Sequence, residues 1–221
     1  MKIVPAILAN DIDQFNKYLV KCEDLGVDEI QIDICDGRFV DNKTVSINKI
    51  KQSVIKYNFK LQFHLMVESV PKYLAELEEI KTKIIYIHFE ALKNNRNFVG
   101  KNIGLAVNPE TQIESIKNFL PNFTSVLIMT VEPGFYGGKF LVENLEKIDG
   151  LRKLGFKGKI GIDGGIDNES LKKVIRHKPD FVCSGSYLLN SEKPIEVWEK
   201  YQKLNPKSEY RNTKQYLNPN I

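Results

Sequence analysis

Short runs of β-branched and aliphatic residues alternate along the chain with longer segments whose apolar residues recur at helical spacing. The short runs predict eight strands, at Lys2–Leu8, Glu29–Cys35, Leu61–Met66, Ile84–Glu90, Ile103–Val107, Ser125–Val131, Lys159–Asp163 and Phe181–Ser184. Between the first two runs, Phe15, Leu19 and Cys22 follow the spacing of an amphipathic helix. Because parallel strands need crossover connections of about a dozen residues, this alternation predicts an all-parallel sheet.

Eight strand and helix units in a chain of 221 residues predict a particular α/β architecture. A closed (β/α)₈ TIM barrel needs about 200 to 250 residues. A doubly wound open sheet is the alternative, but such sheets usually have about six strands. No G-x-G-x-x-G follows the first run either. We therefore expect a single barrel over residues 1–204 and a polar C-terminal tail over 205–221.

Polar and ionisable residues occupy one face of several predicted strands. In the second strand Gln31 and Asp33 alternate with isoleucines, while His64 and Asp163 hold matching positions in the third and seventh. Burying isolated carboxylates is costly unless they are paired or bind a metal. We therefore expect Asp33, His64 and Asp163 to converge at the C-terminal mouth of the barrel, where barrel enzymes carry their sites. We interpret three further residues as structural, with His88 and Glu90 as hydrogen-bonding partners in the core and His177 at the surface.

Glycines follow the last two predicted strands. Asp163-Gly164-Gly165 ends the seventh and Ser184-Gly185-Ser186 ends the eighth. Barrel loops at these places commonly hold a phosphate, because glycine lets backbone N–H groups approach it closely. The loop Pro133–Gly138 follows the sixth strand and can close over such a site. The pattern favours a phosphorylated ligand.

Composition excludes other classes of protein. The chain is 42% hydrophobic with a net charge of +4, and its basic residues are scattered, which argues against nucleic acid as a partner. No apolar run approaches the roughly 20 residues of a membrane span, so we expect no membrane association. The three cysteines Cys22, Cys35 and Cys183 form no C-x-x-C motif, which favours a reducing, cytoplasmic location. A homo-oligomer is compatible with these properties.

The sequence resembles the ribulose-phosphate 3-epimerase family as far as about Asn190. The resemblance is carried by Pro5-Ala6-Ile7-Leu8, Gln31-Ile32-Asp33-Ile34-Cys35-Asp36-Gly37, Phe39-Val40-Asp41-Asn42, His64-Leu65-Met66, His88-Phe89-Glu90-Ala91, Met129-Thr130-Val131-Glu132-Pro133-Gly134-Phe135, Asp163-Gly164-Gly165 and Ser184-Gly185-Ser186. It implies a ribulose-phosphate-binding barrel that interconverts ribulose 5-phosphate and xylulose 5-phosphate with a divalent metal, such as zinc, iron, manganese or cobalt.

The resemblance also implies roles for individual residues. Asp33 and Asp163 would be the acid/base pair and, with His64, metal ligands. Met66 and Met129 would pack against the substrate. The phosphate would be held by Gly137, Gly138, Gly164, Gly165, Gly185 and Ser186.

Four positions depart from the family pattern. Gln31 stands where the family usually has a metal-binding histidine, and a neutral amide oxygen binds transition metals less well than imidazole. Ala6 replaces a substrate-contacting serine, Tyr136 replaces a small residue and Cys35 replaces a methionine. The expected metal affinity is accordingly lowered, and the expected substrate wall is changed.

Two alternatives stay open beside pentose-phosphate epimerisation. Ala6 and Tyr136 favour an epimerase of another ketose phosphate, such as allulose 6-phosphate, and Gln31 favours a phosphosugar-binding barrel without catalysis. A related decarboxylase or aldol-type lyase is disfavoured. Those barrels carry D-x-K-x-x-D, whereas Asp33-Ile34-Cys35-Asp36 contains no lysine.

Overall fold

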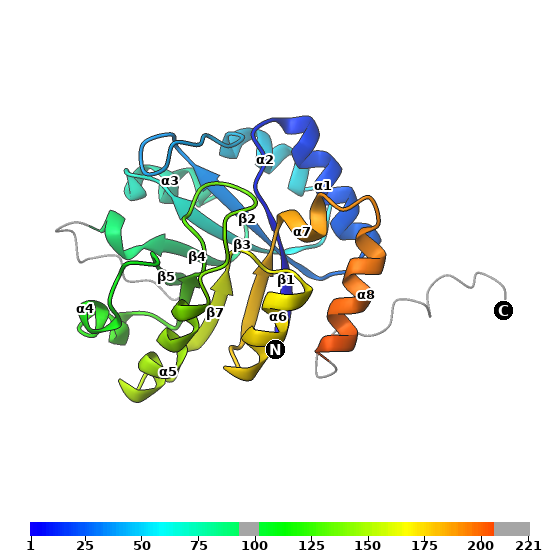
Figure 1. The fold of residues 1–221 in the computed structure, drawn as a ribbon. Coiled ribbons are helices and arrows are strands. Elements are labelled where there is room, and N and C mark those ends of the chain that lie inside the picture. The colour runs from blue at the N-terminus through cyan, green and yellow to red at the C-terminus, as the bar shows by residue number, and fades with distance from the viewer. Residues whose placement is uncertain (93–101, 206–221) are drawn as a thin grey trace.

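A computed structural model describes residues 1–92 and 102–205 and shows a closed barrel of parallel strands in sequential order (Figure 1). The strands are β1 (Lys2–Ile7), β2 (Glu29–Cys35), β3 (Lys60–Met66), β4 (Thr82–His88), β5 (Ile103–Val107), β6 (Ser125–Met129), β7 (Lys159–Asp163) and β8 (Phe181–Ser184). The first strand pairs with both β2 and β8, which closes the sheet. The predicted (β/α)₈ barrel is confirmed.

Helices surround the strands, as Figure 1 shows. They are α1 (Ile12–Asp24), α2 (Ile47–Val54), α3 (Val70–Leu77), α4 (Ile113–Ile116), α5 (Glu146–Lys153), α6 (Asn168–Arg176), α7 (Ser186–Leu189) and α8 (Pro194–Leu204), with short 3-10 turns η1 (Phe89–Ala91), η2 (Leu120–Asn122) and η3 (Val142–Leu145). Side-chain caps fix two of the helix starts. Asp11 accepts a hydrogen bond from the N–H of Gln14 at the start of α1, and Asp167 forms a capping box with Ser170 at α6.

The main hydrophobic core lies between the strands and the helices. Ile30, Ile32 and Ile34 of β2 belong to it, together with Phe15 and Leu19 of α1, and all five are buried. Burying an aliphatic side chain of this size contributes about 1.5 to 3 kcal/mol. Because side chains alternate along a strand, the other residues of β2, Gln31, Asp33 and Cys35, point into the barrel interior.

A second core fills the lower part of the barrel interior. The rings of Tyr86 and Phe181 lie there with centroids 6.1 Å apart. Each ring takes the space beside a glycine of a neighbouring strand, since a Cβ on Gly161 would lie 2.1 Å from the Phe181 ring and one on Gly104 2.5 Å from Tyr86. These rings form a floor that separates the C-terminal end of the barrel, where barrel enzymes carry their sites, from a second cavity at the N-terminal end.

The predicted strands match the structure to within two residues at every end. The sixth predicted strand ends earlier than expected, at Met129, and the fourth ends at His88 because η1 begins there. Asn205, which we assigned to the tail, is buried, and its amide donates to the carbonyl of Met1 over 2.8 Å. The rest of the predicted tail, 206–221, lies outside the described residues.

Two expectations from composition can be compared with the structure. Cys22, Cys35 and Cys183 are all free and buried. Within 1–92 and 102–205, no helix has the length and apolar character needed to span a membrane.

Candidate active site

Three strands bring Asp33, His64 and Asp163 together inside the upper barrel. Asp33 and His64 are register partners on the neighbouring strands β2 and β3, and Asp163 ends β7. Nδ1 of His64 lies 3.3 Å from Oδ1 of Asp33 and 3.4 Å from Oδ2 of Asp163. All three side chains are buried. The convergence expected from the strand pattern is present.

The two carboxylates and the imidazole alter one another's protonation. Burial raises the pKa of Asp33, and the negative charge of Asp163 adds to this rise, while hydrogen bonds from His64 and Gln31 oppose it. Burial alone would lower the pKa of His64, but hydrogen bonds to Asp163 and Asp33 and their charges raise it to about 9. The imidazole therefore balances part of the buried negative charge.

Gln31 lies directly beneath these residues on β2. Its amide nitrogen donates to Oδ1 of Asp33 over 2.9 Å and to Oδ2 of Asp163 over 2.6 Å. Its oxygen accepts from the thiol of Cys183 over 3.1 Å, and burial raises the pKa of that thiol well above its usual value, which keeps it protonated. Two carboxylates require donors, so this amide orientation satisfies every group. Gln31 thus presents nitrogen, which cannot bind a cation, where we considered a ligand oxygen.

The acidic pair and His64 fit a divalent cation. Ligand atoms of Asp33, His64 and Asp163 all lie within 4.8 Å of one another, and two carboxylates with one imidazole suit zinc, iron, manganese or cobalt. Gln31 does not fit as a fourth ligand in the observed orientation. The chain therefore offers three candidate protein ligands, the number that catalytic zinc sites commonly use.

A cavity of about 500 Å³ opens above this cluster. The predicted site residues that line it are Asp33, His64, Met66, Met129, Gly137, Gly138, Asp163, Gly164, Gly165, Gly185 and Ser186. The thioether side chains of Met66 and Met129 are buried in its wall. Of the predicted residues, only Gln31 is not part of the lining, because it lies below the carboxylates. The volume suits a small phosphorylated sugar.

Glycines after β7 have backbone conformations that other residues rarely adopt. Gly164 has φ +108° and Gly165 has φ +67°. A Cβ on Gly164 would lie 2.4 Å from Cγ2 of Val131. The Thr130 hydroxyl lies 2.7 Å from the carbonyl oxygen of Gly164, where it donates a hydrogen bond that ties this turn to the end of β6. This hydrogen bond fixes the turn against β6, where its glycines line the cavity.

Tyr136 joins the loop after β6 to strand β1. Its hydroxyl donates to the carbonyl of Ala6 over 2.9 Å and accepts from the N–H of Leu8 over 2.7 Å. Burial raises the pKa of this hydroxyl well above its usual value, so it keeps its proton. The ring also lies against Gly185, where an added Cβ would be 2.6 Å from Cε1. The bulky residue anchors the loop and forms part of the cavity wall.

His88 is a buried hydrogen-bonding residue in the core, as expected, whereas its partner Glu90 is only half-buried, and His88 also contacts the site. Nε2 of His88 lies 2.7 Å from Nε2 of His64, and Nδ1 of His88 lies 3.3 Å from Oε2 of Glu90. His177 is half-buried at the end of α6, 3.5 Å from the exposed carboxylate of Asp149.

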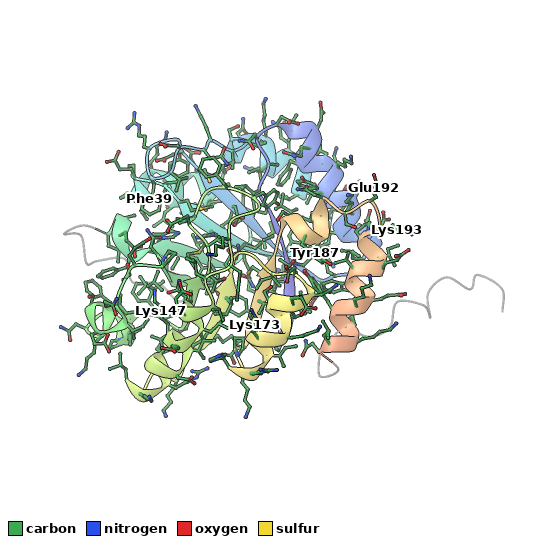
Figure 2. All side chains as sticks on the ribbon, in the orientation of Figure 1. Phe39, Lys147, Lys173, Tyr187, Glu192 and Lys193 are labelled. Atoms are coloured by element: carbon green, nitrogen blue, oxygen red, sulfur yellow. The ribbon has the colours of Figure 1, made fainter. Side chains whose placement is uncertain are left out.

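Sequence reasoning missed three polar residues of the cavity wall. Lys139 directly follows the Gly137-Gly138 pair, Asp167 caps α6, and Tyr187, labelled in Figure 2, lies on α7. The amide of Asn168 donates to the Tyr187 hydroxyl over 3.0 Å and so links α6 to α7. The Asp167-x-x-Ser170 capping spacing and the lysine beside two glycines were the available signals.

Comparisons with known proteins agree with this geometry. A model of the ribulose-phosphate 3 epimerase family matches residues 2–189. The ribulose-phosphate 3-epimerase of Methanocaldococcus jannaschii is 32% identical over 202 residues, covering 87% of this chain and 86% of that protein. The Bacillus subtilis protein of that name is 30% identical over 197 residues, covering 84% and 91%.

Solved structures support the fold independently. The 3-hexulose-6-phosphate synthase of Salmonella typhimurium superposes with a TM-score of 0.68 at 15% identity, covering 94% of this chain and 99% of that one. At this identity the likeness concerns the barrel alone. The family match and the curated relatives go further, and by them this chain belongs to the ribulose-phosphate 3-epimerase family, whose epimerases are isomerases.

Proposed function

We propose that the protein interconverts D-ribulose 5-phosphate and D-xylulose 5-phosphate by moving a proton at C3. The observation that carries this proposal is the pair of buried carboxylates, Asp33 and Asp163, held together on strands that are not neighbours. Inverting a carbon next to a ketone requires removal of a proton from one face and its return on the other. Two carboxylates that converge on one cavity from different strands are suited to that exchange.

In this mechanism one carboxylate of the pair accepts the C3 proton, which leaves an enediolate, and the other, in its acid form, returns a proton to the opposite face. Burial and the negative charge of Asp163 raise the pKa of Asp33, which favours Asp33 as the member of the pair that carries the proton. A divalent cation bound by Asp33, His64 and Asp163 would supply Lewis-acid stabilisation of the negative substrate oxygens. Met66 and Met129 would exclude water from the reacting carbon.

The phosphate would lie at the glycine loops, on the side of the cavity formed after β6, β7 and β8. Backbone N–H groups of Gly164, Gly165 and Gly185 can approach a phosphate closely because no side chain intervenes. Gly137, Gly138 and the neighbouring Lys139 close this side, and the lysine adds positive charge. Binding the phosphate here would place the carbon chain of the sugar over the acidic pair.

A second candidate substrate is a six-carbon ketose phosphate such as allulose 6-phosphate. Ala6 lines the cavity and has no hydroxyl to offer to a sugar, and its carbonyl is already bound by Tyr136. The methyl side chain of Ala6 leaves more room for a longer sugar than the hydroxymethyl side chain of a serine would. A barrel that only binds phosphosugars is the weaker alternative, because the curated relatives carry the name of an enzyme.

Initial rates on the two sugars would test the proposal. We expect purified protein supplied with manganese, cobalt, iron or zinc to epimerise ribulose 5-phosphate faster than allulose 6-phosphate. Ala6→Ser is the matched variant, because it adds a hydroxyl to the wall and is expected to widen the preference for the pentose. Faster turnover of the six-carbon sugar would assign the second function, and no turnover of either would reject both.

We also place the protein in the cytoplasm. The support is the set of three free, buried cysteines, which suits a reducing compartment.

A further inference from the structure

The motif His88-Phe89-Glu90 has no part in the proposed proton transfer, yet it is connected to His64. His88 is the last residue of β4 and is fully buried. Its ring and that of His64 have centroids 4.9 Å apart and planes inclined by 25°, with the two Nε2 atoms 2.7 Å apart. The rings therefore meet nitrogen to nitrogen, nearly in one plane, with a single proton between them.

The other nitrogen of His88 faces a carboxylate. Its Nδ1 lies 3.3 Å from Oε2 of Glu90. The second oxygen of Glu90 accepts from the backbone N–H of Asn108 over 3.0 Å and from the hydroxyl of Thr111. These two donors on one oxygen suit the ionised form of the carboxylate. An ionised carboxylate only accepts, so Nδ1 of His88 must carry a proton.

Counting donors then fixes the remaining protons. With its proton on Nδ1, neutral His88 has an acceptor at Nε2, so the proton between the rings belongs to Nε2 of His64. If His88 donated from Nε2 as well, it would carry both ring protons and a positive charge beside the single carboxylate of Glu90. A positive charge is better placed on His64, which faces two carboxylates. Nδ1 of His64 is left as the atom that faces Asp33 and Asp163.

We propose that His88 and Glu90 are positioning residues that hold a proton on Nε2 of His64, so that Nδ1 is the nitrogen presented to the acidic pair and, once its own proton leaves, to a cation. A metal-binding histidine commonly donates its outer N–H to a neighbouring group, and losing that partner typically weakens metal binding by 10- to 100-fold. Here the neighbouring group is a second histidine, itself oriented by Glu90. This inference rests on the proposed function, because it uses His64 as a ligand of the same site.

The protonation of His88 can be read without any variant or substrate. The chain has three histidines, so ¹H–¹⁵N long-range spectra of the ¹⁵N-histidine-labelled, metal-free protein contain three ring systems. We expect His88 to show a protonated Nδ1 and an unprotonated Nε2, and His64 to show a protonated Nε2. A His88 ring protonated on Nε2 would overturn the proposal, whether or not the protein proves to be an epimerase.

Metal affinity supplies the second test. Zinc competition with a chromophoric chelator would compare wild type with His88→Leu, His88→Gln and the remote control His177→Gln. We expect His88→Leu to bind zinc 10- to 100-fold more weakly. We expect His88→Gln to recover most of this loss, since its amide oxygen can accept from His64, and His177→Gln to stay within twofold of wild type. Wild-type zinc affinity in His88→Leu would contradict the proposal.

Discussion

The side-chain amide of Gln31 bridges the two acidic residues of the site, with its nitrogen 2.6 Å from Oδ2 of Asp163 and 2.9 Å from Oδ1 of Asp33. A single neutral donor group thus lies between two buried carboxylates that would otherwise repel each other. Cys183 fixes its orientation by donating to the amide oxygen. Gln31 therefore holds the two carboxylates together by hydrogen bonds, and the proposed metal ligands are Asp33, His64 and Asp163.

This relationship predicts the effect of replacing Gln31 by histidine. An imidazole nitrogen at this position would add a fourth protein ligand, which binds transition metals better than an amide. We expect Gln31→His to bind zinc or cobalt at least about tenfold more tightly than wild type. Titration of the metal-free proteins in the presence of a competing chelator measures this change.

Gln31→Ala is the companion variant. It removes the donor to both carboxylates, and an unsatisfied buried polar group costs about 1 to 3 kcal/mol. We expect its metal-free form to melt below wild type, with the difference reduced when metal is added. Equal zinc affinity of wild type and Gln31→His would show instead that the amide oxygen already serves as a ligand.

Tyr136→Phe tests the anchoring of the loop after β6. The change removes a hydroxyl that bonds both the Ala6 carbonyl and the Leu8 N–H, leaving these backbone groups without that partner. We expect a loss of about 1 to 3 kcal/mol in the free energy of unfolding, measured in urea. We also expect KM for the phosphosugar to rise more than kcat falls, because the glycines of the loop would be held less firmly. An unchanged KM would mean that the loop does not depend on this anchor.

Gly164→Ala tests the proposed phosphate-binding loop after β7, and Gly155→Ala is its matched control. Both glycines have positive φ, +108° and +85°, but a Cβ on Gly164 would collide with Val131, whereas none of the surrounding atoms lies within 4 Å of one on Gly155. We expect Gly155→Ala to lose about 1 kcal/mol of stability from backbone strain and to keep its KM. Gly164→Ala should weaken binding of inorganic phosphate, measured by calorimetry, at least about tenfold, which is 1.4 kcal/mol. Similar phosphate affinities of the two variants would place the phosphate elsewhere.

Glu29 at the opposite end of the barrel predicts how stability depends on pH. It is fully buried and paired with Lys2 and Lys83. Burial alone would raise its pKa, but hydrogen bonds from Lys2, Lys83 and Gln62 lower it from 4.5. A lowered folded-state pKa stabilises the protein above the unfolded value and loses that effect as pH falls through the folded value.

We accordingly expect Glu29→Gln to destabilise the protein by about 3 kcal/mol at pH 7, the lower range for breaking a buried ion pair. The deficit relative to wild type should stay constant down to about pH 5 and shrink below pH 4.5. Urea unfolding across this range measures it. Glu196→Gln, which breaks an exposed pair with Lys193, is the control and should leave the midpoint unchanged. A Glu29→Gln deficit that persists undiminished well below pH 4 would argue against the ionised, paired Glu29.

The sequence predicts the barrel because its signals are periodic and local. Alternation in β2 separates Ile30, Ile32 and Ile34 from Gln31, Asp33 and Cys35, and both sets lie on the expected faces. The convergence of Asp33, His64 and Asp163 follows from strand order alone, since parallel strands end at the same mouth.

What could not be predicted depends on side-chain orientation and on contacts between distant segments. Whether Gln31 presents oxygen or nitrogen depends on Cys183, 152 positions away in the sequence. The position of the Tyr136 ring depends on its hydrogen bonds with the Ala6 carbonyl of β1 and with the N–H of Leu8, just after that strand. His88 had the same pattern as any buried polar strand residue, and only the packing of β4 beside β3 reveals its contact with His64.

The most direct test of the account is the interconversion of ribulose 5-phosphate and xylulose 5-phosphate in deuterated buffer by wild type, Asp33→Asn, Asp163→Asn and the surface control Asp149→Asn. Wild type and the control should interconvert the sugars with deuterium appearing at C3. Each active-site variant should lose interconversion by about 10² to 10⁴-fold, the usual contribution of a positioned acid or base. Interconversion at the wild-type rate in either active-site variant would contradict the two-carboxylate mechanism.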